Sequence, residues 1–376
     1  MKKILDFLKR YKLRNYDFIL IFLVVALSIV GVVAVSSSDE SLQNKQIAGI
    51  ILGCIAMVIL SLFDYSKLLN FYWAYYILAV ILLLGVLLFG SDSHGAQRWL
   101  EVAGITFQPS EISKVLIILF YAKFIMVNKK KVKTLRFLVT AIGLLVPPLL
   151  LILKEPDLST TIMLCIIFVM ILFVGGISWK LVAGVLIAGI PSVALAFYLA
   201  LLEDSPILKS YQQERILAWL HPEDYADTTA YQTMNSIMAI GSGQLQGKGY
   251  NTNEISTVLN SGYISESSTD FIFTVIGEEF GFIGSCVVVF LLVAITIKCL
   301  ITAAKAKDIA GSVIATGMAV WIGFQGLLNI GVATGALPNT GIPLPLVSSG
   351  LTSIVSVYIG IGFVLNVGLQ QIRKSY

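Results

Sequence analysis

Long runs of apolar residues, separated by short polar segments, make up most of the chain. Each run has the length of about 20 residues that an α-helix needs to cross a lipid bilayer. The runs occupy residues 18–36, 46–63, 71–90, 110–127, 135–153, 158–177, 181–202, 271–298, 310–331 and 346–369. We therefore expect an all-α, polytopic membrane protein of about ten transmembrane helices, folded as a single membrane domain over residues 1–376.

One polar segment, residues 203–269, is far longer than the others. Long loops with internal structure are usually functional. Within this segment, Tyr231 to Ile240 predicts a short helix at the membrane interface, and the glycine-rich stretch GSGQLQGKGY after it predicts turns. The stretch is not a phosphate-binding P-loop, because its spacing is wrong and no Ser or Thr follows Lys248. We expect residues 203–269 to form one large extracellular loop.

The composition agrees with a membrane protein. Hydrophobic residues make up 57% of the chain and charged residues 13%, whereas about a quarter of the residues of a soluble protein are charged. The net charge of +4 gives no reason to expect nucleic-acid binding. The four cysteines lie in or beside apolar runs and are interpreted as small buried hydrophobes. Neither histidine has a cysteine neighbour that would indicate a zinc site.

Basic residues cluster in alternate loops, which is typical of the cytoplasmic side of membrane proteins. The basic segments are the start of the chain, Lys67, Asn128 to Lys133, Lys180, Lys305 to Asp308, and Arg373–Lys374. The first apolar run is longer than the core of a cleaved signal peptide, so we expect a retained first helix. Both termini are therefore predicted to lie in the cytoplasm.

The stretch ESSTDFIFTVIGEEFG, Glu266 to Gly281, places acids at the start of a predicted membrane helix and inside it. On a helix from Asp270, Glu278 would lie roughly 12 Å deeper in the membrane. Asp270 can then meet a substrate at the outer surface, although a helix cap also explains an acid there. Glu278 and its neighbour Glu279 are expected to find partners inside the bundle.

Small residues accompany these acids. Asp270, Thr274, Gly277 and Gly281 fall on one side of the predicted helix. Such a stripe allows a neighbouring segment to approach closely.

A second polar stretch, GAQRWLEVAGITFQPSEISK, runs from Gly95 to Lys114. Arg98 and Trp99 are expected in an external loop. Glu111 and Lys114 lie three apart on one helical face and can form an ion pair. A structural salt bridge and the binding of an anionic substrate by Lys114 or Arg98 are both open interpretations.

Two further segments complete the outer face. In KEPDLST, Asp157 leads into a predicted helix, where the helix dipole alone explains an acid. In LPNTGIPLPLVSSG, Leu337 to Gly350, prolines and glycines break the helical pattern, which is tolerated where the backbone lines a cavity. The convergence of these acids and bases favours an amphiphilic substrate with an anionic headgroup over an ion channel.

The motifs resemble those of the SEDS family, which includes RodA, FtsW and SpoVE. The resemblance is carried by GAQRW, FQPSEISK, EPDLST, AIGSG, TDFIFTVIGEEFGFIG and LPNTGIPLPL, and GAQRW and NTGIPLPL look more like RodA than FtsW. It implies a ten-helix glycosyltransferase of the bacterial cell membrane that polymerises lipid II, with Asp270 as the catalytic residue. The implied partners are a class B penicillin-binding protein and other membrane proteins of the elongation complex. SSGLTS departs from the usual SYGGSS, which weakens any role for Ser349.

The implied reaction needs one well-placed carboxylate, because lipid pyrophosphate leaves without a proton once its charge is met. Arg, Lys or a divalent cation such as Mg²⁺ or Mn²⁺ can meet that charge. Asp270 would act as the general base in an inverting transfer. The predicted substrate-binding residues are Arg98, Trp99, Glu111, Lys114, Asp157, Arg215, Lys248, Glu266, Thr269 and Ser348.

Three alternatives stay open at this point. A polymerase of the FtsW or SpoVE type would act at the division or sporulation septum. A lipid II transporter would also carry charges inside its helices, but at mid-membrane or along both halves. A non-catalytic cell-wall scaffold would tolerate the loss of Asp270.

Overall fold

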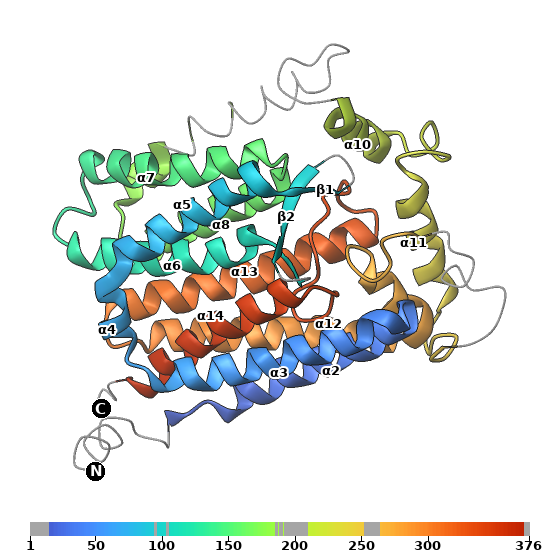
Figure 1. The fold of residues 1–376 in the computed structure, drawn as a ribbon, viewed down its shortest axis with the longest axis horizontal. Helices are drawn as coiled ribbons and strands as arrows, with labels where there is room; N and C mark the ends of the chain where they lie inside the picture. The colour runs from blue at the N-terminus through green and yellow to red at the C-terminus, as the bar shows by residue number, and fades with distance from the viewer. Residues whose placement is uncertain are drawn as a thin grey trace.

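The structure, a computed structural model, describes residues 15–93, 96–102, 105–184, 187, 191, 210–251 and 264–371. It is a bundle of long helices with a small sheet and two short helices at one end (Figure 1). The helices are α2 (Phe18–Ser38), α3 (Glu40–Leu62), α4 (Tyr65–Leu68), η2 (Leu69–Phe71), α5 (Tyr72–Phe89), α6 (Pro109–Val127), α7 (Leu135–Lys154), α8 (Leu158–Val174), α10 (Ser210–Leu220), α11 (Tyr231–Ser242), α12 (Ile272–Ala304), α13 (Ile309–Ala333) and α14 (Leu351–Leu369).

The predicted spans agree with the helices. Every predicted range except 181–202 coincides with a described helix, and most of 181–202 lies outside the described residues. Among the described residues, 7 helices are long and apolar enough to cross a membrane, and α8 is a shorter apolar helix. The protein is therefore a polytopic helical membrane protein, as predicted.

Helices α13 and α14 form the centre of the bundle. Their most apolar stretches are 72% and 83% buried, whereas that of the outer stretch Tyr65–Phe89 is only 17% buried. Helix α3 packs along α14 and α12 packs along α13. Large apolar side chains such as Phe22, Leu88 and Phe290 are exposed on the outer helices. Such an apolar surface suits contact with lipid tails.

The two ends of the bundle differ in character. At one end, Asn366 Nδ2 donates to the carbonyl of Ser61, and the hydroxyl of Tyr65 donates to Asp308, at 2.7 and 2.9 Å. The opposite end carries the sheet, α10 and α11 (Figure 1). Among the described residues, the predicted cytoplasmic segments at Lys67, Asn128 to Lys133 and Lys305 to Asp308 thus share one end, and the predicted external segments share the other (Figure 1). Which end faces the cytoplasm stays a prediction.

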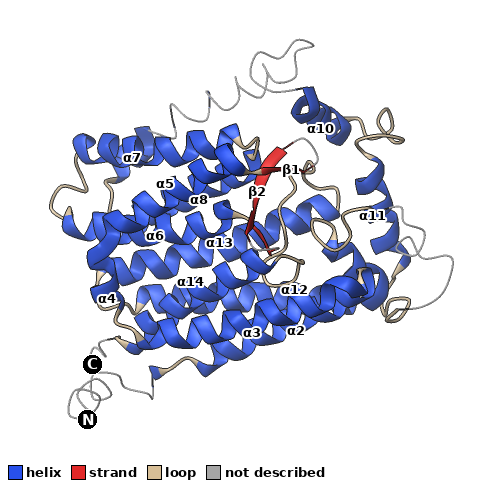
Figure 2. Cartoon of the chain, in the orientation of Figure 1, coloured by secondary structure: helices blue, strands red, loops and turns tan. Residues whose placement is uncertain are grey.

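A three-stranded antiparallel sheet, absent from the all-α prediction, follows α5 and precedes α6 in the chain. It lies at the end of the bundle that faces α10 and α11 (Figure 2). Its strands are β1 (Ser91–Ser93), β2 (Ala96–Val102) and β3 (Ile105–Phe107), with Leu100 opposite Phe107 in the register of β2 and β3. Arg98 and Trp99 are therefore on strand β2 rather than in a loop. The sheet was missed because β1 and β3 have only 3 residues each, and the sequence of β2, AQRWLEV, does not alternate strictly between apolar and polar residues.

Helix α12 also departs from the predicted continuous helix. Gly281 has φ 63° and ψ −157°, a conformation that glycine tolerates, and it breaks the helix there. The loop after α11 supplies the missing hydrogen bonds. The N–H groups of Phe282 and Ile283 donate to the carbonyls of Gln244 and Leu245 at 2.9 and 3.2 Å. The glycine-rich stretch is thus more than a set of turns, because it inserts into α12.

The predicted stripe of small residues on α12 is confirmed as a site of close packing. Its neighbour is α11, which also confirms the short helix predicted over Tyr231 to Ile240. Thr274 and Ser236 of α11 share a hydrogen bond between their hydroxyls. A Cβ atom at Gly277 would lie 2.8 Å from the side chain of Ile240, so a larger residue there would force Ile240 to shift.

Candidate functional site

Asp270 lies in a turn before α12, since the helix begins at Ile272 and not at Asp270 as predicted. Its main chain is held firmly: Asn329 Nδ2 donates to its carbonyl at 2.8 Å, and the next residue, Phe271, is fully buried. The side chain is only partly buried. Within the described part of the chain, no hydrogen bond to its carboxyl group is seen. The fold therefore fixes the position of Asp270 and leaves its carboxyl group available.

Gly341 marks the point where this carboxylate meets a positive charge. A Cβ atom on Gly341 would lie 3.3 Å from Oδ2 of Asp270 and 3.9 Å from Nη1 of Arg215. Arg215 belongs to α10, so three separate segments converge here. Gly341 has φ 67°, in the left-handed region that favours glycine. The absence of a side chain leaves room between the Asp270 carboxylate and the Arg215 guanidinium.

The electrostatic surroundings make Asp270 a stronger base than an ordinary aspartate. Burial raises its pKa to about 6, and the charges of Glu266 and Asp157 act in the same direction. The guanidinium groups of Arg215 and Arg98 oppose this rise. At neutral pH the group is mostly ionised, which suits a general base.

Arg98 is held beside the start of α8. Its Nη2 and Nε atoms donate to the carbonyls of Pro156 and Glu155 at 2.6 and 3.4 Å. Asp157 caps α8 by accepting from the N–H and hydroxyl of Thr160 at 3.0 and 2.8 Å. The predicted capping role of Asp157 is thus present, while its charge still acts on Asp270.

Glu155 is an acid in this region that sequence reasoning missed. It is fully buried, and neither carboxyl oxygen has a hydrogen-bond partner in the described structure. Burial raises its pKa to about 8, with Asp157 adding to the rise and Arg98 opposing it. Glu155 therefore carries a proton at neutral pH. The two acids that flank a proline in KEPDLST were the only available signal.

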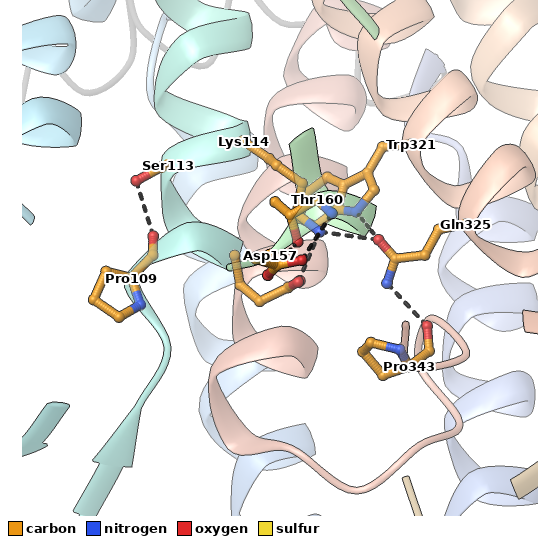
Figure 3. Close-up of polar contacts among 9 residues, drawn as sticks. Pro109, Ser113, Lys114, Asp157, Thr160, Trp321, Gln325 and Pro343 are labelled. Atoms are coloured by element: carbon orange, nitrogen blue, oxygen red, sulfur yellow. Dashed lines mark hydrogen bonds and ion pairs between the residues drawn. The ribbon is translucent and has the colours of Figure 1, made fainter. Parts of the chain in front are cut away.

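The predicted pair of Glu111 and Lys114 is present and buried, and Figure 3 shows Lys114 beside Trp321 and Gln325. Lys114 Nζ lies 2.7 Å from Glu111 Oε1 and 2.9 Å from Gln325 Oε1, and it stands 4.6 Å from the centre of the Trp321 ring. Gln325 Nε2 in turn donates to the carbonyl of Pro343 at 2.9 Å. These contacts favour the structural interpretation of Lys114 over direct substrate binding.

The predicted partners of Glu278 and Glu279 are found at the kink of α12. Glu278 Oε1 lies 2.7 Å from Lys248 Nζ, and Glu279 accepts from the hydroxyl of Ser37 and from the N–H of Asn251. Lys248 is therefore paired with a buried carboxylate. The charges that act on Asp270 come from other residues.

Residues 12–372 match the cell cycle protein family of FtsW, RodA and SpoVE. The chain belongs to this family. It is 33% identical to the peptidoglycan glycosyltransferase MrdB of Escherichia coli (strain K12), over 88% of this chain and 87% of that protein. It is 31% identical to the probable peptidoglycan glycosyltransferase FtsW of Bacillus subtilis (strain 168), over 95% of this chain and 91% of that protein.

Solved structures agree with this membership of the FtsW, RodA and SpoVE family. A chain of a peptidoglycan synthase complex that coordinates polymerization and crosslinking superposes with a TM-score of 0.78, at 27% identity, over 94% of this chain and 97% of that chain. The rod shape determining protein RodA of Thermus thermophilus superposes with a TM-score of 0.69, at 25% identity, over 96% of this chain and 98% of that chain.

Three further predicted residues, Glu266, Thr269 and Ser348, hold the turn that carries Asp270. Thr269 Oγ1 donates to Glu266 Oε2 at 2.7 Å. Ser348 Oγ donates to the carbonyl of Thr269 at 2.6 Å and accepts from the N–H of Leu344 at 2.7 Å. Trp99 follows Arg98 on β2 and is half-buried. In the described part of the chain, no group of three or more His, Cys, Asp and Glu residues is arranged to hold a metal ion.

Proposed function

We propose that this protein is a peptidoglycan glycosyltransferase that polymerises lipid II in the bacterial cell membrane during cell elongation. The observation that carries the proposal is the convergence of the Asp270 carboxylate and the Arg215 guanidinium at Gly341. The chain that carries these two groups is similar over most of its length to proteins named peptidoglycan glycosyltransferases. The raised pKa of Asp270 adds support, because a general base works best with a pKa near the working pH.

In the proposed reaction, Asp270 takes the proton from a sugar hydroxyl of the acceptor. The oxygen of that hydroxyl forms the new bond to the anomeric carbon of the donor sugar. The bond from this carbon to the lipid pyrophosphate breaks, and the pyrophosphate leaves with the electron pair. Arg215 and Arg98 are the cationic side chains whose charges act on Asp270. We therefore assign to them the neutralisation of the charge on the leaving pyrophosphate. One displacement of this kind inverts the anomeric configuration.

The partner we propose is a class B penicillin-binding protein, together with other membrane proteins of the elongation complex. The similarity to a chain of a synthase complex that coordinates polymerization and crosslinking supports a crosslinking partner. A second candidate role, polymerisation at the division septum, is favoured by the comparable identity to a protein named FtsW.

We further propose that the end with Asp270 faces outward and that both termini lie in the cytoplasm. The exposed lysines of residues 129–133 at the opposite end support this orientation. Reporter fusions after Lys131 should then report the cytoplasm, and fusions at Gln244 the outside. A cytoplasmic signal at Gln244 would contradict the orientation.

The activity is tested with purified full-length protein, alone and with a class B penicillin-binding protein, given fluorescent lipid II in detergent and in vesicles. Glycan polymers resolved on a gel are the expected product. Movement of lipid II across the vesicle membrane without polymer would instead indicate a transporter. No activity of either kind, with normal binding of the partner, would indicate a scaffold. Rescue of shape-defective rather than division-defective cells distinguishes elongation from division.

A further inference from the structure

Asn329 on α13 joins the two segments that form the site. Its Nδ2 atom donates to the carbonyl of Asp270 at 2.8 Å and to the carbonyl of Ile342 at 2.7 Å. Asp270 belongs to the turn before α12, and Ile342 follows Gly341 in the segment between α13 and α14. Both hydrogen atoms of one amide are thus used to hold the two main chains that meet at Gly341.

The amide is a costly choice at this position, because Asn329 is 1% exposed and its Oδ1 atom has no hydrogen-bond partner in the described structure. A buried polar atom without a partner is destabilising, so an apolar side chain would fold more easily here. The opposite orientation of the amide would point its oxygen at two carbonyl oxygens, so the contacts fix which atom is the donor. Among uncharged side chains of this length, only an amide places two N–H donors on one atom.

Gln325, one turn earlier on α13, provides a comparison. Its Nε2 atom donates to the carbonyl of Pro343, the residue after Ile342 (Figure 3). Gln325 therefore holds the same segment as Asn329, but within the described part of the chain it forms no hydrogen bond with Asp270 or its turn. Its Oε1 atom is occupied by Lys114 and Trp321. The contact with Asp270 is what distinguishes Asn329.

We propose that Asn329 is a positioning residue for Asp270, which sets the distance between its carboxyl group and the segment at Gly341. This proposal rests on the proposed function for its kinetic consequence, but its structural consequence does not. Without the amide, the turn before α12 is free to move away from Gly341. A displacement of a reacting group by about 1 Å can cost about 100-fold in rate.

The test compares Asn329→Leu, Asn329→Gln and Gln325→Met in full-length protein. The first measurement is the pH dependence of carbodiimide labelling at Asp270, followed by mass spectrometry, since only the protonated carboxyl group reacts. We expect Asn329→Leu to lower the midpoint from that of the wild type, because a displaced carboxyl group is less buried. Gln325→Met should keep the wild-type midpoint. The same midpoint in Asn329→Leu and wild type would overturn the proposal.

The second measurement is polymerisation of lipid II by the same proteins. Asn329→Leu should lower kcat at least about 10-fold with little change in KM, and Asn329→Gln should recover part of the loss because it keeps both donors. Equal losses in Asn329→Leu and Gln325→Met, with identical labelling midpoints, would indicate support of the shared segment only. If Asn329→Leu fails to fold, Asn329→Gln decides: its longer side chain keeps both donors but should displace Asp270 in part, so its midpoint should differ from that of the wild type. A wild-type midpoint in Asn329→Gln would then overturn the proposal. If the wild type does not polymerise lipid II but the labelling midpoint of Asn329→Leu is lowered as expected, the proposed function is refuted and the positioning role of Asn329 is kept.

Discussion

The acids at the two ends of the stretch Glu266 to Gly281 have opposite surroundings. At the kink of α12, Glu278 is fully buried and paired with Lys248 at 2.7 Å, and Glu279 receives hydrogen bonds from Ser37 and Asn251. Just before the helix, Asp270 has its main chain held by Asn329, and its carboxyl group has no hydrogen bond in the described part of the chain. An acid within an apolar bundle is costly, so it is either neutralised by a partner or retained for function. Glu278 and Glu279 therefore stabilise the bundle, and the proposed catalytic role belongs to Asp270.

The strongest test of this contrast is replacement of each acid by its amide. Asp270→Asn removes the proton acceptor and should lower the rate of glycan polymerisation by about 10²–10⁴, roughly 3–5 kcal/mol of barrier. Folding should be retained, because a neutral amide is cheaper to bury than a carboxylate. Glu278→Gln is the matched control, with thermal stability and partner binding measured on both. Wild-type polymerisation by folded Asp270→Asn would refute the catalytic assignment.

Removal of the positive partner tests the structural end. Lys248→Met leaves Glu278 buried without its ion pair, which typically costs about 3–5 kcal/mol of stability. The double variant Lys248→Met with Glu278→Gln should recover much of that loss. Unfolding in detergent measures both. A well-folded Lys248→Met with a raised KM for lipid II would instead support the predicted role of Lys248 in substrate binding.

The same contrast shows which features sequence reasoning can reach. The pair of Glu111 and Lys114 was predictable because residues three apart meet on one helical face. The pair of Lys248 and Glu278 joins positions thirty residues apart, so only the need for some partner could be predicted. The spans were likewise local features of hydropathy. The break at Gly281 could be predicted only with knowledge of the loop that inserts there, and the longest strand of the sheet, AQRWLEV, lacks strict alternation.

The roles of two polar residues of α13, Gln325 and Asn329, could not be predicted from the sequence either. Gln325 and Asn329 look like isolated polar residues in an apolar helix, and nothing near them in sequence indicates their partners. Those partners, the carbonyls of Pro343, Ile342 and Asp270, are backbone groups of distant segments. Asp270 itself was identified from the resemblance of its motif, and the structure adds the glycine and arginine that surround it.

A smaller effect on polymerisation is expected from a methyl group added at Gly341, between Asp270 and Arg215. Gly341→Ala places a Cβ atom 3.3 Å from Oδ2 of Asp270 and strains a backbone with φ 67°. We expect about a 10-fold loss of polymerisation from displacement of the carboxylate, with a modest loss of stability. Gly143→Ala is the matched control, since nothing lies within 4 Å of its Cβ position. Equal activities of the two variants would show that the gap at Gly341 is not used.

The pH dependence of the wild type sharpens the assignment further. Because the pKa of Asp270 is raised to about 6, the active carboxylate should be lost as pH falls through that value. The plot of kcat/KM against pH should therefore have an acidic limb near pH 6, rather than near the value of an ordinary aspartate. A limb that is unchanged in the residual activity of Asp270→Asn would assign the titration to another group.

The smallest effect on catalysis is expected at Glu155, which has no hydrogen-bond partner in the described structure. Burial raises its pKa to about 8, well above the ordinary value of a glutamate, which applies in the unfolded chain. Between these two values the folded state holds a proton that the unfolded state has released, so stability falls as pH rises. The contribution is complete below the unfolded pKa and is lost as pH rises through about 8.

Glu155→Gln is neutral at every pH and should remove this decline. The melting temperature of the variant, relative to wild type, should therefore rise from pH 5 to about pH 8 and level off above it, while polymerisation per folded molecule stays near wild type. Asp157→Ala is the control, because it removes the cap and lowers stability but keeps the carboxyl group of Glu155, whose decline with pH should remain. A constant difference between Glu155→Gln and wild type would mean that Glu155 is already ionised in the folded protein, with Arg98 as the neighbour that holds its charge.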